Sequence, residues 1–488
     1  MKQLIQNFKT GETKLIDTPI PRVGRGKVLI KAHRSLVSLG TEKMLVSFGQ
    51  ASLLGKVKQQ PHRVKEVLGK MKSDGIKATI DTVNTKLNTP INLGYSNAGE
   101  IIAIGEDITE FKIGDRVISN GSHAEYVSVP KNLVSKIPDN VSYDEACFTV
   151  VSSIGLQGIR LINPTYGETV VVLGLGLIGL ISIQLLKANG CNVIGIDPDL
   201  KKVSIAKGYG IDAFSPMEMD PVKYVESKTM NNGADAVLIT ASAKTNEIIK
   251  QSAQMSRKRG RIVLVGVIGL SIDRSDFYEK ELSFQVSCSY GPGRYTSGYE
   301  NKGQDYPIGF VRWTENRNFQ AILNSLENGS LNVSKLVTEK LDFDDFDKIY
   351  GDIDKSNSIA TVFTYSKEER LSNIIELPVT NKKTILDSNA RGQIAIIGSG
   401  NFTQARVIPS LKKLKAPVKY VMSANGLSST ISAEKLKAKY STTDLKKILE
   451  DDEVKNIIIT TRHDLHASFV LKALKSDKNV FVEKPLAI

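Results

Sequence analysis

The first stretch of the sequence with a recognisable chemical purpose is a glycine-rich turn that follows a short apolar strand pattern. The turn, Gly174-x-Gly176-x-x-Gly179, comes directly after residues 169–173 and is followed by an amphipathic helical pattern. In such a turn the first glycine permits a tight bend, the second admits a pyrophosphate close to the backbone, and the third allows close helix–strand packing. We therefore expect a dinucleotide at the N-terminus of this helix. The expected contacts are Gly174, Gly176, Leu177, Ile178 and Gly179.

An acidic residue, Asp197, ends the next strand pattern after this turn. A carboxylate at the tip of this strand accepts hydrogen bonds from the adenosine ribose hydroxyls and repels a 2′-phosphate. The sequence therefore predicts NAD(H) rather than NADP(H) for this part of the chain.

A second glycine pair, Gly398-x-Gly400, follows another apolar strand pattern near the end of the chain. Thr403 stands where a third glycine would complete the motif, so this fingerprint is weaker on its own. We expect a second dinucleotide site that includes Asn401 and Phe402. The following strand pattern ends near Ser423 and Asn425 without an acid, which leaves the choice between NAD and NADP open here.

Residues 289–322 combine aromatic rings with several arginines and include the only tryptophan. Such side chains stack against sugar or base rings and bind carboxylates or phosphates. Aromatic packing at a domain junction would account for the same composition. The functional interpretation predicts a substrate site that contains Arg294, Tyr295, Arg312 and Trp313.

Composition restricts the possible classes of protein. The 488-residue chain has a formal net charge of +13, but its basic residues alternate with acidic ones and form no basic stripe with stacking aromatics, so we do not expect nucleic-acid binding. No apolar run of membrane-spanning length and no signal peptide is evident. The three cysteines are far apart in the sequence, which fits a reducing compartment and gives no thiolate metal cluster. We expect a cytoplasmic protein without membrane insertion.

The overall pattern predicts an α/β multidomain protein. Residues 1–150 read as an irregular β domain with a helical insert at about residues 44–90, completed by residues 290–365. Residues 151–289 alternate strands and helices, as in a doubly wound parallel sheet. A polar linker is expected at residues 366–391, and a second Rossmann-like domain at residues 392–488.

Residues 10–365 resemble the medium-chain dehydrogenase/reductase family, whose members join a GroES-like β domain to a Rossmann domain. The resemblance is carried by Gly105, by FKIGDRV (residues 111–117), by GSHAEYVSVP (residues 121–130) and by the first glycine fingerprint. Zinc-dependent members carry a cysteine, a His-Glu pair and a third ligand, together with a structural four-cysteine lobe. Here the matching positions hold Ser38 and Leu39, Tyr95 and Ser96, and Val150 and Val151, and the lobe is missing. Since zinc prefers thiolate, imidazole and carboxylate ligands, the resemblance implies an enzyme without zinc or any other metal.

In a zinc-free member, side chains must polarise the carbonyl group or accept the alcohol proton. Tyr95 and Thr41 fall where the family keeps a metal ligand and its hydroxyl relay, so the resemblance implies that they act at the nicotinamide. Tyr95 could equally fill the space left by the metal. Glu42 is either a buried base or an anchor for its loop, and His123 is expected to be structural.

The C-terminal stretch is similar to the glucose-fructose oxidoreductase, inositol dehydrogenase and MocA family. Its Glu483-Lys484-Pro485 turn and His466 match family positions, and the resemblance places Lys484 beside the nicotinamide ribose. In that family a further α/β half builds the substrate pocket. Because the sequence stops after the turn, we expect this truncated module to be idle in catalysis.

Together, the two resemblances suggest a bacterial bi-domain oxidoreductase of the kind often tied to surface polysaccharide assembly. The expected reaction interconverts an alcohol and a carbonyl group on a small molecule, plausibly a sugar or sugar nucleotide. Two alternatives stay open: a quinone- or enone-type double-bond reductase, and a non-catalytic dinucleotide-binding scaffold or sensor. A homodimer is possible by analogy with medium-chain relatives.

Overall fold

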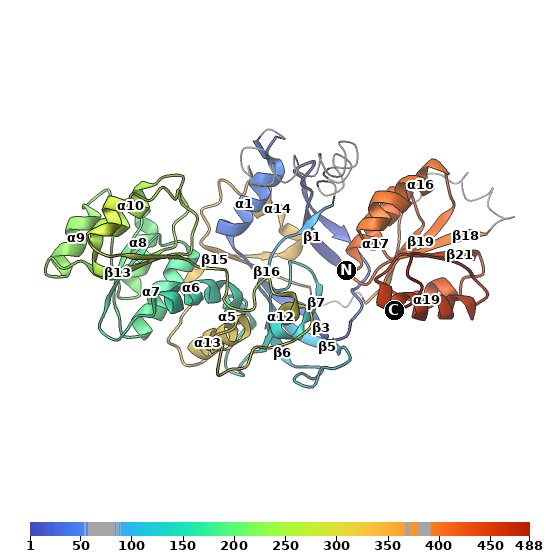
Figure 1. Cartoon of the computed structure of the whole chain (residues 1–488), viewed down its shortest axis with the longest axis horizontal. Coiled ribbons are helices and arrows are strands. Elements are labelled where there is room, and N and C mark those ends of the chain that lie inside the picture. Colours follow the sequence, from blue (N-terminus) through green and yellow to red (C-terminus); the bar gives the residue numbers. More distant parts are fainter. Residues whose placement is uncertain (53–54, 57–82, 84–86, 88, 367–370, 379–391) are drawn as a thin grey trace.

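A computed structural model describes residues 1–52, 55–56, 83, 87, 89–366, 371–378 and 392–488. It contains four sheets, which define an N-terminal unit (β1–β8, β15 and β16), a central unit (β9–β14) and a C-terminal unit (β17–β22). The N-terminal unit lies between the other two (Figure 1). Most of the expected helical insert at about 44–90 lies outside the described residues, but helix α1 (Leu39–Gln50) overlaps its start.

The N-terminal unit is built mainly from β-strands, and residues far apart in the sequence share its larger sheet. That sheet has the order β15-β16-β3-β5-β6-β8, with β7 paired to β3, and the smaller one has the order β2-β1-β4. Strands β15 and β16 thus bring the segment after the central unit back to the first strands of the chain. The strands are β1 (Lys2–Gln6), β2 (Thr13–Asp17), β3 (Lys27–Val37), β4 (Ile91–Asn92), β5 (Asn97–Ile104), β6 (Arg116–Ser119), β7 (Tyr126–Pro130), β8 (Val134–Lys136), β15 (Val337–Asp342) and β16 (Ala360–Thr364).

The central unit is a six-stranded parallel sheet with the order β11-β10-β9-β12-β13-β14, the doubly wound arrangement expected from the alternating pattern. Its middle strands are almost wholly apolar and buried, because helices cover both faces of the sheet. The strands are β9 (Thr169–Leu173), β10 (Asn192–Ile196), β11 (Asp212–Phe214), β12 (Ala234–Ile239), β13 (Ser256–Leu264) and β14 (Ser283–Val286). The helices are α7 (Leu177–Ala188), α8 (Leu200–Gly208), α9 (Pro221–Lys228), α10 (Glu247–Met255) and α11 (Arg274–Tyr278).

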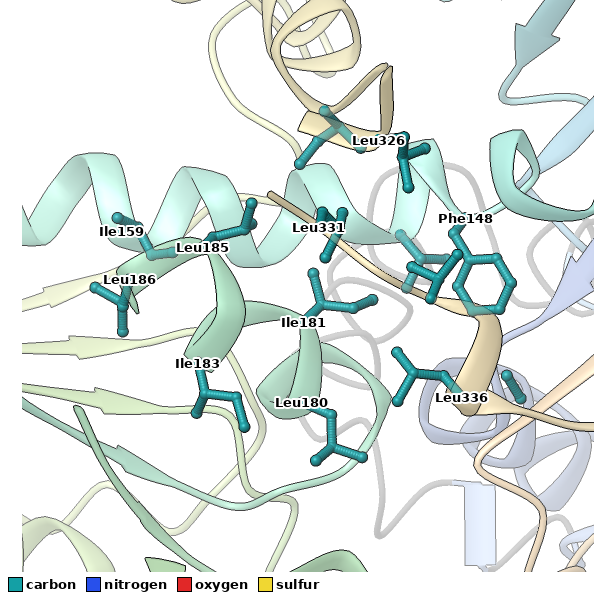
Figure 2. Close-up of a cluster of buried hydrophobic side chains, with 14 of the residues drawn as sticks. Phe148, Ile159, Leu180, Ile181, Ile183, Leu185, Leu186, Leu326, Leu331 and Leu336 are labelled. Atoms are coloured by element: carbon teal, nitrogen blue, oxygen red, sulfur yellow. The ribbon is translucent and has the colours of Figure 1, made fainter. Parts of the chain in front are cut away.

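Helix α6 (Thr149–Ile162) joins the N-terminal and central units. Figure 2 shows Leu180 and Ile181 of α7 and Leu326 of α13 (Glu315–Glu327) around α6, with Phe148 at its start. This shared hydrophobic core fixes the orientation of the glycine-rich turn relative to the β-strands. The remaining short helices before the C-terminal unit are α5 (Tyr143–Ala146), α12 (Ser297–Glu300), α14 (Asp347–Tyr350), η1 (Lys131–Leu133), η2 (Ser334–Leu336) and η3 (Phe343–Asp345).

The C-terminal unit has a second sheet of the order β17-β20-β19-β18-β21-β22, parallel except for the edge strand β17. Strand β17 (Ile374–Glu376) belongs to the segment predicted as a linker, so that prediction does not hold for these three residues: their backbone extends the sheet by antiparallel pairing with β20, and Ile374 packs against the apolar core of the unit. The other strands are β18 (Gln393–Ile397), β19 (Val418–Met422), β20 (Tyr440–Thr442), β21 (Val454–Ile459) and β22 (Asn479–Val482). The helices are η4 (Thr403–Val407, a π-helical turn), α16 (Ile408–Lys413), α17 (Leu427–Leu436), α18 (Leu445–Leu449) and α19 (His463–Leu474).

Within the ranges given above, the structure contains no helix that is both long and apolar enough to cross a bilayer.

Candidate functional site

The glycine-rich turn of the central unit connects β9 to α7, and each of its three glycines has a distinct structural reason. Gly174 has a φ of +95°, which favours glycine. A Cβ atom on Gly179 would lie 2.0 Å from the carbonyl oxygen of Gly174, so only glycine fits. A Cβ atom on Gly176 would meet nothing within 4 Å. The fold therefore does not itself require Gly176, and the open space beside it at the N-terminus of α7 fits a pyrophosphate.

Asp197 follows β10 directly and is held in place by the same turn. Its carboxylate accepts hydrogen bonds from the backbone N–H of Leu175 (2.7 Å) and of Asp199 (2.8 Å). The Nζ of Lys202 lies 3.8 Å from Oδ1. Leu177 and Ile178, at the start of α7, are half-buried against the shared core. The turn and the acid thus form one site that fits the pyrophosphate and adenosine ribose of a dinucleotide.

Two predicted catalytic residues, Tyr95 and Thr41, are brought together by the N-terminal unit. Their hydroxyl oxygens lie 3.2 Å apart, Thr41 in the first turn of α1 and Tyr95 just before β5. Burial raises the pKa of Tyr95, although hydrogen bonds to Ser38 and Thr41 act in the opposite direction. A protonated phenol next to a second hydroxyl can donate a hydrogen bond to a carbonyl oxygen.

Glu42 takes part in a buried hydrogen-bond network next to this pair. Its carboxylate accepts hydrogen bonds from the backbone N–H of Ser38 (3.1 Å) and from the hydroxyl of Tyr350, and it lies 3.3 Å from Nε2 of His123. Nδ1 of His123 lies 2.6 Å from the hydroxyl of Ser35. Both carboxylate oxygens are therefore already in use, which favours the anchoring role over the role of a base. The sequence did not reveal Tyr350, because 308 residues separate it from Glu42.

The predicted substrate residues form two separate aromatic–arginine pairs. The guanidinium carbon of Arg312 lies 3.8 Å from the centroid of the Trp313 ring, and Arg160 of α6 lies 3.3 Å from that centroid. Arg294 lies 4.1 Å from the ring centroid of Tyr295, which is 73% exposed, and forms an ion pair with Glu300. Sequence reasoning missed Arg160, since its helix lies far from the aromatic segment in the chain.

A further acid that the sequence did not single out, Glu315, lies at the first position of α13 and is fully buried. Within the described residues, neither oxygen of its carboxylate has a hydrogen-bond partner, and Nε of Arg294 is also unpaired. Burial and the charge of Glu300 raise the pKa of Glu315 to about 8, while Arg294 acts to lower it. The carboxyl group is therefore largely protonated at neutral pH.

In the C-terminal unit, the loop after β18 resembles the first turn in its geometry. Gly398 has a φ of +107°, and a Cβ atom there would lie 2.6 Å from the backbone of Thr460, whereas one on Gly400 would meet nothing within 4 Å. The hydroxyl of Thr403 donates to the carbonyl oxygen of Gly398 (3.1 Å), so a threonine closes the loop where a third glycine was missing. Asn401 and Phe402 are exposed beside this open space, which fits a second pyrophosphate.

The Glu483-Lys484-Pro485 turn follows β22 and is fastened to the neighbouring strand and helix. The backbone N–H of Glu483 donates to the carbonyl oxygen of Ile459 (3.1 Å). The side chain of His466 is buried, with Nδ1 2.7 Å from the carbonyl oxygen of Pro485 and Nε2 3.1 Å from that of Thr461. Lys484 is exposed. In the described part of the chain, no three His, Cys, Asp or Glu side chains are grouped so that they could hold a metal ion.

Comparison with known families assigns each unit. Residues 65–139 match the alcohol dehydrogenase GroES-like domain, residues 178–301 match the zinc-binding dehydrogenase family, and residues 393–488 match the oxidoreductase family with an NAD-binding Rossmann fold.

Similar proteins include several dehydrogenases. D-guloside 3-dehydrogenase of Escherichia coli K12 is 29% identical over 51% of this chain and 70% of its own length. (R,R)-butanediol dehydrogenase of Bacillus subtilis 168 is 24% identical over 54% of this chain and 76% of its own length. Among solved structures, an alcohol dehydrogenase from Thermus sp. ATN1 superposes with a TM-score of 0.58 at 18% identity, covering 75% of this chain and all of that one. A short chain alcohol dehydrogenase of Escherichia coli CFT073 complexed with NADH superposes with a TM-score of 0.56 at 20% identity, over 75% and 99% of the two chains.

The fold and the matched families define a nicotinamide-dependent oxidoreductase. The chain combines the two domains of a medium-chain dehydrogenase/reductase with the NAD-binding domain of the glucose-fructose oxidoreductase, inositol dehydrogenase and MocA family. It belongs with enzymes that interconvert alcohols and carbonyl compounds and act on small molecules.

Proposed function

We propose that the N-terminal and central units catalyse zinc-independent, NAD(H)-dependent interconversion of an alcohol and a carbonyl group on a sugar or sugar nucleotide. The observation that carries this proposal is the hydrogen-bonded pair of Tyr95 and Thr41. The nicotinamide, when bound, supplies or accepts the hydride. Tyr95 and Thr41 then move the accompanying proton to or from the substrate oxygen.

The raised pKa of Tyr95, caused mainly by burial, supports a phenol that stays protonated at neutral pH and donates to the carbonyl oxygen during reduction. In the opposite direction, the Tyr95 hydroxyl accepts the alcohol proton as it passes its own proton to the Thr41 hydroxyl, and half-buried Thr41 passes a proton on to water. Ser38, Tyr95 and Ser96 carry hydroxyl groups, which are poor ligands for zinc, and the Ser96 hydroxyl already donates to the carbonyl oxygen of Cys147 (2.5 Å). Both facts support catalysis by side chains rather than by a metal ion.

Arg294, Tyr295, Arg312 and Trp313 are the proposed substrate contacts, since stacked rings and guanidinium groups recognise sugars and phosphates. The names of D-guloside 3-dehydrogenase and of the sorbitol dehydrogenases among the relatives support a sugar or polyol substrate.

A role in surface polysaccharide metabolism, a cytoplasmic location and a homodimer remain predictions from the sequence.

The test is a substrate screen with three variants. Purified protein is assayed with NAD⁺ or NADH against sugars, polyols, nucleotide sugars, enones and quinones, and its metal content is measured. We expect Tyr95→Phe to lower kcat by about a hundredfold or more. Thr41→Val should act in the same direction, and both variants should bind NADH as the parent does. Tyr166→Phe is the matched control, because Tyr166 is 90% exposed.

Full activity of Tyr95→Phe on its best alcohol or carbonyl substrate would refute the proposed role of the phenol. Stoichiometric zinc whose removal abolishes turnover would refute zinc independence. Turnover of enones or quinones alone would identify a double-bond reductase instead.

A further inference from the structure

The segment between β2 and β3 of the N-terminal unit runs along the carboxyl ends of two strands of the C-terminal unit. The backbone N–H of Arg22 donates to the carbonyl oxygen of Ala424 (2.8 Å), just beyond β19. The hydroxyl of Thr443, just beyond β20, donates to the carbonyl oxygen of Ile20 (2.8 Å). In a dinucleotide-binding sheet, this edge is where the adenosine ribose binds.

The contact is closely packed. A Cβ atom on Gly426 would lie 2.3 Å from the carbonyl oxygen of Pro19, so the backbones approach as closely as glycine allows. Ile5 and Ile16 form a buried apolar cluster with Leu427 and Ile431 of α17. Figure 1 shows β1 and α17 next to one another. The N-terminal unit thus has a defined position over the second dinucleotide site.

A cavity of about 400 Å³ lies between the two units at this edge. Pro21, Arg22 and Lys27 line it from the N-terminal unit, and Ala424 and Asn425 line it from the tip of β19. Among the described residues that line it, none is acidic. The cavity therefore combines a ribose-binding strand tip with an excess of positive charge.

The two basic side chains that line this cavity are those of Arg22 and Lys27. Lys27 is partly buried, and its pKa is lowered by burial and by the positive charge of Arg462, which precedes α19. In the described structure, neither the ammonium group of Lys27 nor the guanidinium group of Arg22 forms an ion pair with an acid. Repulsion between Lys27 and Arg462 opposes the contact between the two units, and a bound anion would relieve it.

We propose that this cavity receives the 2′-phosphorylated adenosine ribose of NADP(H) bound to the C-terminal unit, and that Arg22 and Lys27 of the N-terminal unit bind the 2′-phosphate. The tip of β19 supports this choice, because Ser423 and Asn425 present no carboxylate that would repel the phosphate. The phosphate specificity of the second site is then supplied by a different unit of the same chain. This inference concerns a site other than that of the proposed function and does not depend on it.

The test separates the two dinucleotide sites in the full-length chain by calorimetric titration with NADPH and NADH. Gly176→Val blocks the first site, because its side chain enters the space in front of α7. In that background we expect one remaining site that prefers NADPH and is lost on adding Gly400→Val. Arg22→Ala and Lys27→Ala should each lower the affinity for NADPH about tenfold and change the affinity for NADH less than about threefold.

Arg25→Ala is the matched control, since exposed Arg25 pairs with Asp107 and does not line the cavity. If thermal unfolding shows that Arg22→Ala has lost structure, Arg22→Gln, a milder change at the same exposed position, replaces it. As a second probe, 2′,5′-ADP should displace NADPH more strongly than 5′-ADP does.

The proposal would be overturned by no dinucleotide binding after Gly176→Val, by equal affinity of the remaining site for NADH and NADPH, or by unchanged NADPH affinity in the Arg22 and Lys27 variants. Preferential binding of UDP or of a UDP-sugar, with 2′,5′-ADP no better than 5′-ADP, would assign the cavity to a different nucleotide and would also overturn it. None of these outcomes bears on Tyr95.

Discussion

Nε2 of His123 lies 3.3 Å from a carboxylate oxygen of Glu42, and both side chains are completely shielded from solvent. On its other side, His123 contacts Ser35, whose hydroxyl lies 2.7 Å from that of Tyr365. The network thus connects α1, β3 and Tyr365, which directly follows strand β16. We infer that it holds the helix that carries Thr41 in place next to Tyr95.

Replacing Glu42 should therefore lower the stability of the fold, and we expect no direct effect on the catalytic step. Glu42→Ala leaves the Ser38 N–H, the Tyr350 hydroxyl and His123 without their shared acceptor, so we expect a loss of about 3 kcal/mol in the free energy of unfolding. Urea denaturation followed by circular dichroism measures this loss. The neighbouring Lys43, which pairs only with Asp354 at the surface, provides the control, and Lys43→Ala should change stability by less than about 1 kcal/mol. Equal stability of the two variants would contradict the anchoring role.

Substitutions at two of the three glycines of the first turn should separate cofactor binding from folding. Gly176→Ala places a methyl group in the open space expected for the pyrophosphate, so NADH affinity should fall more than about tenfold while the melting temperature stays unchanged. Gly179→Ala forces a methyl group to within 2.0 Å of the carbonyl oxygen of Gly174, so this variant should lose stability even without cofactor. Thermal melts with and without NADH distinguish the two effects, and a melting temperature lowered equally in both variants would argue against a ligand at Gly176.

Asp197 should determine the cofactor preference of the first site. Asp197→Asn reduces the negative charge and the acceptor strength for the ribose hydroxyls, so we expect NADH affinity to fall about tenfold and the preference for NADH over NADPH to shrink. The measurement is a fluorescence titration with both cofactors. Asp199→Asn is the control, because Asp199 caps α8 through the N–H of Lys201 (2.9 Å) and asparagine caps equally well. The same loss of affinity in both variants would show that Asp197 has no special role.

Local patterns predicted the parallel sheets well. The apolar run at residues 169–173 and the glycine turn are patterns of residues that are close together in the sequence. Strand β9, helix α7 and the position of Asp197 could therefore be predicted from local signals. The strand order of the seven-stranded sheet was harder to predict from the sequence. Strand β16 pairs with β3 across more than three hundred residues, and no local pattern encodes that partner. The docking of residues 19–22 on the C-terminal unit had no sequence signal for the same reason.

For the candidate sites too, residues in local patterns could be predicted from the sequence, whereas residues that depend on tertiary contacts could not. The glycine turn and Asp197 could be located from the sequence because their spacing is local, and their role in binding a dinucleotide stays a prediction. Glu315 could not, since an acid at the start of a helix is normally exposed and favourable there. Its burial arises from tertiary structure, since its backbone N–H donates to the carbonyl oxygen of Pro292 (2.8 Å) and Arg294 lies near its carboxylate.

Glu315 therefore provides a prediction about pH that depends on the tertiary structure alone. Its pKa is about 8 in the folded chain, against 4.5 for an unperturbed glutamate, chiefly because burial disfavours the charged form. Below pH 4.5 the group is protonated in both states and does not affect stability. As the pH rises towards 8, the unfolded state loses the proton first, so folding becomes progressively less favourable; above pH 8 the destabilisation is constant.

Glu315→Gln removes this titration and keeps the shape of the side chain. We expect the variant to gain stability relative to the parent as the pH rises from 5 to 8, by up to a few kcal/mol, with no further gain above that. Urea unfolding at pH 5.5, 7 and 8.5 measures the difference. Glu327→Gln, at the exposed far end of the same helix, should show almost no pH-dependent difference. A parent whose stability relative to Glu315→Gln rises with pH would mean that the carboxylate is ionised and paired in the folded chain, and Arg294 would be its partner.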